Sequence, residues 1–233
     1  MRVVFVGPSL PANAHPMATD ILFRPPAVQG DVLAAVRSGA QVIGIVDGGF
    51  EYTAPVLHKE ILYALSHRVH VFGAASMGAL RAAECRTFGM VGIGRIYEEY
   101  VSGAIVDDAD VALLHGPSEL GYRPLTVPMV NVRATLDAIE VCGELDPAHR
   151  LEIERAASVT FFKKRTWKTV LENANMTNAE RRALLPVLIS REVDQKAADA
   201  GALVRAVKDA DLEAAPHAPQ WIFNNTLPLW NGE

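Results

Sequence analysis

The sequence contains little that would suit a metal site, a disulfide framework or a nucleic-acid partner. Only two cysteines occur among 233 residues, Cys85 and Cys142, and they form neither a CxxC pair nor a His/Cys cluster with zinc spacing. The formal net charge is -5, without the clustered basic residues that nucleic acid or anionic lipid would attract. We therefore expect a reducing compartment, no metal or cofactor, no nucleic acid, and partners that are proteins or small molecules.

Membrane and targeting segments are also missing from the pattern. No stretch approaches the roughly 18 uninterrupted apolar residues of a membrane helix. The first residues, MRVVFVGPSL, carry one basic residue and an apolar run too short for a signal peptide. Neither GxGxxG nor GxxxxGK[ST] occurs, so no motif supports a nucleotide site. These features predict a cytoplasmic protein that does not enter a membrane.

The first third of the chain alternates between apolar runs and helix-like segments. Three runs, Val3–Val6, Val42–Val46 and Val69–Phe72, each lead into a glycine or small-residue turn. Between them, Gly30–Ser38 and His58–Leu65 carry apolar residues at helical spacing. This rhythm, with continuous rather than alternating apolar runs, predicts an α/β fold with a small parallel, Rossmann-like sheet. The hydrophobic share of 50% is enough for a core of one or two domains.

The second half is expected to be mostly helical. We expect an α/β core over residues 1–127, and over residues 128–233 a helical region that packs on it as one continuous unit. The expected elements after the core strands are a helix at Arg95–Tyr100, a short strand at Val111–Leu114, and helices at Met129–Val141, Ala148–Val159, Phe162–Ala174, from about Asn178, and at about Val193–Lys208. Gly89–Gly94 is expected to be a loop. The last segment, with Trp221, Phe223 and Trp230 among prolines, is expected to be an extended tail that folds back or docks through its aromatics.

The segment Val69–Glu84 is the most informative part of the sequence. An apolar strand leads through Ala74-Ala75-Ser76-Met77-Gly78 into an alanine-rich helix, nearly the spacing of a nucleophile elbow. Ser76 is accordingly a candidate nucleophile, although a serine at such a turn is more often a helix N-cap. Ligands collect beyond the carboxyl ends of parallel strands, so the turns near Ser9, Asp47–Gly49 and Ser76 are expected to converge.

A nucleophilic serine needs a base and oxyanion donors. Lys59, at the start of the second expected helix among apolar neighbours, is one candidate base, provided that burial lowers its pKa. His115, oriented by Asp107 or Asp108, is another, and further candidates are His58, His67, His70, Lys163 and Lys164. Arg81 and Glu84, three residues apart, fit an ordinary surface ion pair.

Several segments resemble the TfuA-like protein family. They are His58–Leu62, Phe72–Glu84, Gly89–Gly94, Asp107-Asp108, His115–Pro117, Gly121–Leu125 and Asn131–Thr135. The resemblance spans about Gly44–Thr135, with weaker agreement around Phe161–Trp167 and in the last helix. Cys85 departs from the family, which tends to have an aliphatic residue there.

The resemblance implies a role in sulfur delivery. TfuA-like proteins act beside YcaO enzymes, which use ATP to replace a backbone amide oxygen by sulfur. The implied reaction is hydrolysis, by a Ser-Lys pair, of the C-terminal thiocarboxylate of a ThiS-like, ubiquitin-fold sulfur carrier, releasing sulfide for YcaO. Peptide or protein substrates would be reached through YcaO.

The same resemblance assigns roles to individual residues. Ser76 becomes the nucleophile and Lys59 the preferred base, with Lys163 and Lys164 as alternatives. The oxyanion would be held by backbone N–H groups near Met77 and Gly78, with Gly48 or Gly49. Arg81 and Glu84 are assigned to positioning and structure.

Two other functions compete with this hydrolase. One is a non-catalytic adaptor that docks YcaO, the sulfur carrier and the peptide, with Ser76 only capping a helix. The other is a nucleotide-binding enzyme, which would be stabilised against heat by ATP or a dinucleotide.

Overall fold

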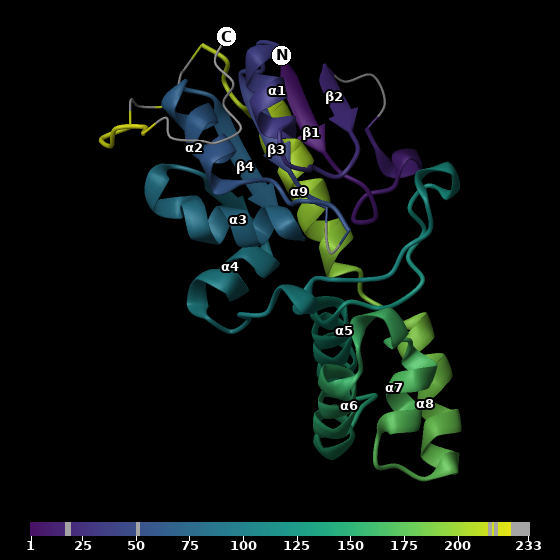
Figure 1. Cartoon of the computed structure of the whole chain (residues 1–233). Helices are drawn as coiled ribbons and strands as arrows, with labels where there is room; N and C mark the ends of the chain where they lie inside the picture. The colour runs from purple at the N-terminus through teal and green to yellow at the C-terminus, as the bar shows by residue number, and fades with distance from the viewer. Residues whose placement is uncertain (17–19, 50–51, 214–215, 217–218, 225–233) are drawn as a thin grey trace.

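A five-stranded parallel sheet forms the centre of the protein (Figure 1). A computed structural model of the chain describes residues 1–16, 20–49, 52–213, 216 and 219–224. The strand order is β2-β1-β3-β4-β5. The strands are β1 (Arg2–Phe5), β2 (Ile21–Arg24), β3 (Val42–Ile45), β4 (His70–Ala74) and β5 (Val91–Ile93). The predicted α/β class and parallel sheet are confirmed.

Residue parity decides which helices cover each face of the sheet. Val3 and Phe5 of β1 face α1 (Asp31–Arg37), α2 (His58–Ser66) and α3 (Met77–Cys85) in one apolar cluster. Val4 and Val6 face the opposite side, where they pack with α9 (Gln195–Asp209). Successive side chains of a strand point to opposite faces, so a continuous apolar run serves both clusters.

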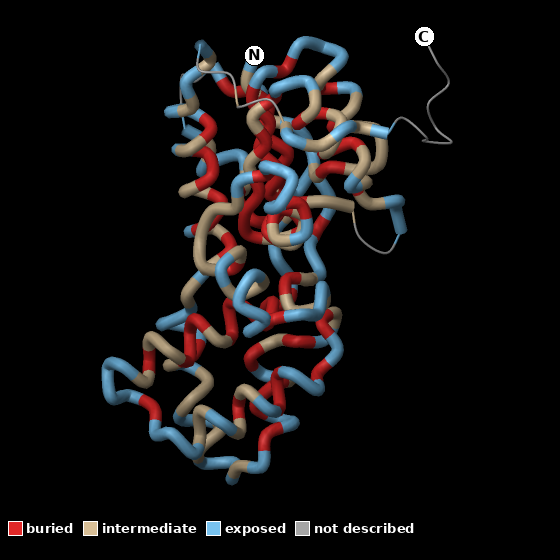
Figure 2. Tube along the Cα trace, turned by 90° about the vertical axis from the view of Figure 1, so that its left-hand side faces the viewer, coloured by how far each residue is buried: buried red, intermediate tan, exposed pale blue. Residues whose placement is uncertain are grey.

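The helices α5 to α8 form a separate apolar core away from the sheet (Figures 1 and 2). They are α5 (Met129–Val141), α6 (Pro147–Val159), α7 (Trp167–Asn173) and α8 (Asn178–Ser190). Buried segments occur both around the sheet and within this helical part, which we call the helical lobe (α5–α8). After α8 the chain returns, and α9 packs on the sheet. The predicted boundary at residues 127 and 128 stays a prediction.

Short elements connect these parts. They are α4 (Arg95–Ser102) and the 3-10 turns η1 (Ala12–Ala14), η2 (Arg86–Phe88), η3 (Asp108–Asp110), η4 (Ser118–Leu120) and η5 (Phe162–Lys164). None of the helices in the described ranges is long and apolar enough to cross a membrane.

Three local predictions need correction. Val91–Ile93, expected to be loop, is strand β5, because pairing with β4 supplies its hydrogen bonds despite Gly92. Val111–Leu114, expected to be a strand, has no strand partner among the described residues, and the next residue, His115, makes an isolated bridge to Pro124. The expected helix Phe162–Ala174 is divided into η5 and α7, and the Thr166 side chain caps α7 by accepting from the Thr169 N–H.

The tail packs back through its aromatics where it is described. The Trp221 indole N–H donates to the Phe88 carbonyl at 3.2 Å, and the two rings meet edge to face. Phe223 contacts the Tyr63 ring of α2. Trp230 lies outside the described residues.

Candidate active site

Ser76 lies at a strained turn between β4 and α3. Its N–H donates to the Ala74 carbonyl at 2.8 Å, which leaves Ala75 as the centre of a three-residue turn with a φ of 65°. An L-residue in this region carries a cost of about 1–2 kcal/mol. Ala75 is fully buried in the apolar cluster beneath α9, and this packing holds the turn in place. The turn thus presents Ser76 at the carboxyl end of β4.

The Ser76 hydroxyl does not cap the helix that follows it. Ser76 occupies the N-cap position of α3, yet its side chain accepts no capping hydrogen bond in the described structure. The usual alternative role for a serine at this position is therefore not the one observed.

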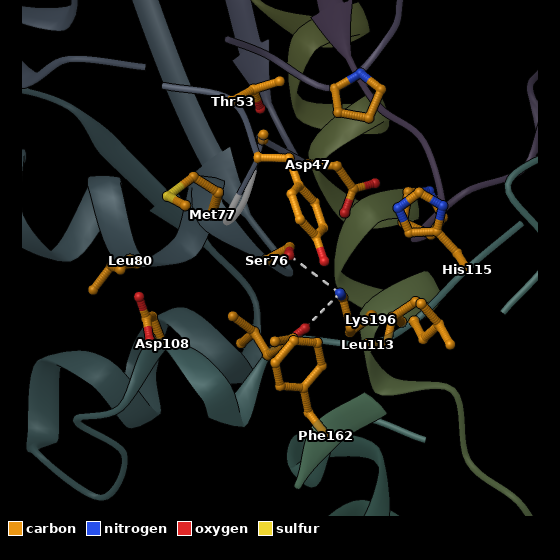
Figure 3. A pocket seen from close by; sticks show the side chains of 18 of the residues that line it. Asp47, Thr53, Ser76, Met77, Leu80, Asp108, Leu113, His115, Phe162 and Lys196 are labelled. Carbon is orange, nitrogen blue, oxygen red and sulfur yellow. Dashed lines mark hydrogen bonds between the residues drawn. The ribbon is translucent and has the colours of Figure 1, made fainter. Parts of the chain in front are cut away.

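Lys196 approaches Ser76 from α9. Its Nζ lies 3.1 Å from Ser76 Oγ and 2.8 Å from the Val111 carbonyl oxygen, to which it donates (Figure 3). A neutral amine that donates to Val111 keeps its lone pair for the Ser76 proton. This contact is the geometry of a nucleophile and its general base.

The start of α9 is fixed by polar contacts with α5. The Lys196 N–H donates to Asn131 Oδ1 at 3.2 Å, and the Asn131 amide donates to Asp194 Oδ1 at 3.0 Å. Asp194 also caps α9 by accepting from the Ala197 N–H. Lys196 is consequently held at its backbone as well as at its amine.

Burial makes Lys196 a suitable base. The residue is 2% exposed, and desolvation lowers the pKa of its ammonium group below the usual lysine range. The negative charges of Asp47 and Asp194 oppose this effect without reversing it. A larger fraction of the amine is therefore neutral near pH 7 than for a lysine in water.

Ser76 and Lys196 open into a pocket of about 430 Å³. The pocket is lined by the turns after β1, β3 and β4, represented by Pro8, Asp47 and Ser76, together with the segment from Val111 to His115 and Phe162 of η5 (Figure 3). Asp47 accepts hydrogen bonds from Gly7 and Ser9 across the first two turns. The predicted convergence of the three turns is confirmed.

The structure does not bring Lys59, the predicted base, to Ser76. Lys59 Nζ donates to the Asn224 carbonyl at 2.7 Å and contacts the Phe223 ring, and the residue is absent from the pocket lining. The reason is helical phase: the buried face of α2 carries Glu60, Ile61 and Leu65, so Lys59 lies on another side of the helix.

The four residues predicted around the oxyanion differ in whether the backbone N–H already has a hydrogen-bond partner among the described residues. The Gly78 N–H donates to the Val46 carbonyl at 3.1 Å, and the Gly49 N–H donates to the Ala27 carbonyl at 2.8 Å. Within the described part of the chain, no hydrogen bond engages the N–H of Met77 or of Gly48. Met77 is the first residue of α3, where a helix N–H has no intrahelical acceptor. Met77 and Gly48 are therefore the amides that remain free to bind an oxyanion.

Gly78 has a packing role instead. A Cβ at this position would lie 1.7 Å from the Ile45 carbonyl oxygen, so α3 approaches β3 at backbone distance. This approach keeps Ser76 beside the end of β3.

Arg81 does not line the Ser76–Lys196 pocket and is held by hydrogen bonds within the protein. Its Nε donates to the Val56 carbonyl at 3.1 Å, and its Nη1 lies 2.7 Å from Glu84 Oε2. Glu84 also contacts His58 Nε2 at 2.7 Å. Arg81 thus ties α3 to the segment before α2, and its predicted positioning role stays a prediction.

The alternative bases are not in contact with Ser76. His115 lines the pocket, but its Nδ1 donates to the Gly116 carbonyl at 2.7 Å rather than to Asp107 or Asp108. Lys163 also lines the pocket, with its Nζ 2.9 Å from the Tyr52 hydroxyl, whereas Lys164 is exposed. No interaction between Ser76 and any of these side chains, or His67 or His70, is found among the described residues.

The sequence model of the TfuA-like protein family matches residues 47–166. This span is more than half of the 233 residues. The chain belongs to the TfuA-like protein family. Membership links the protein to thioamidation. A comparison with curated proteins found no match.

The family match includes Ser76 but ends before Lys196. Lys196, 120 positions from Ser76 in the sequence, was not among the predicted site residues. The sequence held one signal of its burial. Lys196 lies at helical spacing from three apolar residues, Ala200, Leu203 and Val207, so a lysine occupies the apolar stripe of α9. The sequence indicated Asp47 only as part of a turn. The contact of the Val111 carbonyl could not be predicted from a pattern of side chains, because a backbone atom makes it.

Proposed function

We propose that this TfuA-like protein is a serine hydrolase in which Ser76 and Lys196 release sulfide from the C-terminal thiocarboxylate of a ThiS-like sulfur carrier. The observation that carries the proposal is the 3.1 Å contact between Ser76 Oγ and the buried Lys196 amine. Lys196 replaces Lys59 as the proposed base. The released sulfide would serve a YcaO enzyme that thioamidates a peptide or protein backbone.

Acylation begins with proton transfer from Ser76 Oγ to Lys196 Nζ. The serine oxygen forms a bond to the thiocarboxylate carbon, and the oxyanion is bound by the Met77 and Gly48 N–H groups. When the C–S bond breaks, Lys196 returns the proton to sulfur, so HS⁻ leaves and an acyl ester remains on Ser76. Charge and protons balance without a metal ion or a redox partner.

Deacylation uses the same base. Neutral Lys196 accepts a proton from water as the water oxygen attacks the ester carbon. Breakage of the bond to Ser76 Oγ returns this proton to the serine and releases the carrier as a carboxylic acid, which then loses its remaining proton to solvent. The Val111 carbonyl accepts a hydrogen bond from the Lys196 amine, and this bond keeps the lone pair of the neutral amine directed at the reacting atoms.

The test measures sulfide release from thiocarboxylated carrier without YcaO. Ser76→Ala and Lys196→Met are expected to lower the rate by about 10²–10⁴-fold, the range of nucleophile and base removal. Lys59→Met is the matched control, because it removes a lysine of the same protein that contacts the tail instead. Its rate is expected to equal that of wild type.

Three results would overturn part or all of the proposal. Wild-type sulfide release by Lys196→Met would remove this lysine from the chemistry, and a loss confined to Lys59→Met would restore the first choice of base. If Ser76→Ala and Lys196→Met both support full thioamidation in a YcaO reaction supplied with carrier, the adaptor function replaces the hydrolase.

A further inference from the structure

Asp47 is a buried charge that the mechanism above does not use. It follows β3 directly and is 2% exposed. One carboxylate oxygen accepts the Gly7 N–H at 2.8 Å and the Ser9 N–H at 3.0 Å, and the other accepts the Ser9 hydroxyl at 2.7 Å. Three donors from the turn after β1 hold the carboxylate in one orientation.

The orientation of Asp47 places its charge beside the reacting pair. Asp47 lines the same pocket as Ser76 and Lys196, and Figure 3 shows the three side chains around this pocket. The negative charge of Asp47 is the strongest influence that opposes the effect of burial on the Lys196 pKa. A buried ammonium needs such a partner, because water does not reach it.

We propose that Asp47 is a positioning residue of the catalytic pair, whose fixed negative charge stabilises the ammonium form of Lys196 that arises when Ser76 loses its proton. This inference rests on the Ser76–Lys196 mechanism proposed above. In this step Asp47 contributes its charge and takes no part in the proton transfer. The step is still the transfer of one proton from Ser76 Oγ to Lys196 Nζ.

Other charged groups around Lys196 differ from Asp47 in position. Asp194 lies at the start of the same helix, where it caps α9 and binds Asn131. His115, Asp108 and Lys163 also line the pocket. Burial and the neighbouring Asp107 raise the pKa of Asp108. Among the groups named here, Asp47 is a buried carboxylate whose orientation is fixed by hydrogen bonds from another turn, the one after β1.

The variant Asp47→Asn removes the charge and preserves the shape. The amide oxygen can accept the Gly7 and Ser9 N–H groups, and the Ser9 hydroxyl can reverse its role and accept from the new NH₂ group. Ser9→Ala is the matched control, since it deletes one hydrogen bond and keeps the charge. Asp47→Ser is a second variant without charge, for use if the amide variant does not fold.

The primary measurement is the titration of Lys196 itself. In protein labelled with [ε-¹³C]lysine, the Lys196 signal is assigned by its loss in Lys196→Met and followed against pH by NMR. Asp47→Asn is expected to lower the Lys196 midpoint by about one pH unit or more, the size of an effect from a nearby charge. Ser9→Ala is expected to leave the midpoint nearly unchanged. A second measurement follows the rate at which a fluorophosphonate probe labels Ser76 as the pH is raised. The midpoint of this rise is expected to be lowered in Asp47→Asn and nearly unchanged in Ser9→Ala.

A wild-type midpoint in folded Asp47→Asn, or in Asp47→Ser, would overturn the inference and leave Asp47 a purely structural residue. An upward shift would overturn it as well. The titration does not depend on thiocarboxylate turnover. If wild type releases no sulfide but the Lys196 midpoint shifts in Asp47→Asn, the proposed substrate is refuted. If sulfide release depends on Lys196 but the midpoint in Asp47→Asn does not shift, only the role of Asp47 is refuted.

Discussion

Lys196 Nζ lies 3.1 Å from Ser76 Oγ, although 120 positions separate the two residues in the sequence. The serine lies at the carboxyl end of β4, between β3 and β5 in the sheet order, and the lysine lies in the first turn of α9. The contact therefore depends on how α9 packs against the sheet. It also explains why a lysine lies in the apolar stripe of a helix.

Lys196 should make stability depend on pH. Its folded-state pKa is lowered, whereas in the unfolded chain it returns to about 10.4. Between these two values the unfolded state binds more protons, so the free energy of unfolding rises with pH across that window. Below the folded-state pKa the full destabilisation is present. The measurement is denaturant unfolding of wild type and Lys196→Met from pH 6 to about 10. The difference between their free energies of unfolding should narrow as pH rises. A difference that does not change with pH would contradict the lowered pKa.

The activity should rise with pH for the same reason. Proton transfer requires neutral Lys196, so the rate of sulfide release should follow deprotonation of this amine. The midpoint of the acid limb is expected below the pKa of about 10.4 of an ordinary lysine. If Lys196→Arg retains measurable activity and the acid limb of its pH–rate profile has the wild-type midpoint, the titration belongs to another group.

Gly78→Ala should destabilise the protein by about 3 kcal/mol or more, since the new methyl group would meet the backbone of β3. Gly201→Ala in α9 is the matched control. A methyl group there meets only the end of the Arg205 side chain at 3.6 Å. The control should gain about 0.5–1 kcal/mol from helix propensity. Thermal unfolding of both variants tests the prediction, which a stable Gly78→Ala protein would refute.

Arg133→Met should lower activity more than stability. Arg133 of α5 binds Asp110 Oδ2 and Glu154 Oε1, each at 3.2 Å. Asp110 directly precedes Val111, whose carbonyl accepts from Lys196. We expect about a tenfold loss of rate and a loss of stability of about 1 kcal/mol or less, since such pairs contribute little to folding. Lys168→Met, which removes an exposed pair with Glu172, should change neither quantity.

The sequence predicted elements with strong periodicity better than those that depend on distant partners. Met129–Val141 was predicted with the bounds that α5 has, because its apolar pattern is long and helical. β5 was missed because Val91–Ile93 is short, contains a glycine and becomes a strand only through pairing with β4. The Val111–Leu114 segment was wrongly predicted as a strand, since an apolar run alone does not tell sheet from pocket lining.

The candidate site followed the same division. Ser76 and the convergence of the turns could be predicted, because a strand, a small-residue turn and a helix occur in sequence. Lys196 could not, because helical phase shows that a residue is buried but not which residue it meets across the fold. Asp47 belongs to the same class, as its hydrogen bonds join turns that follow different strands.

The return of α9 to the sheet has a consequence for biosynthesis. The strands and the Ser76 turn emerge from the ribosome first, the helical lobe follows, and Lys196 is made only afterwards. Under the proposed mechanism, a nascent or truncated chain that lacks α9 would carry Ser76 without the proposed base. Catalytic competence would then arise only when the chain has been synthesised through α9 and this helix has docked, so unfinished molecules would not consume the carrier's sulfur.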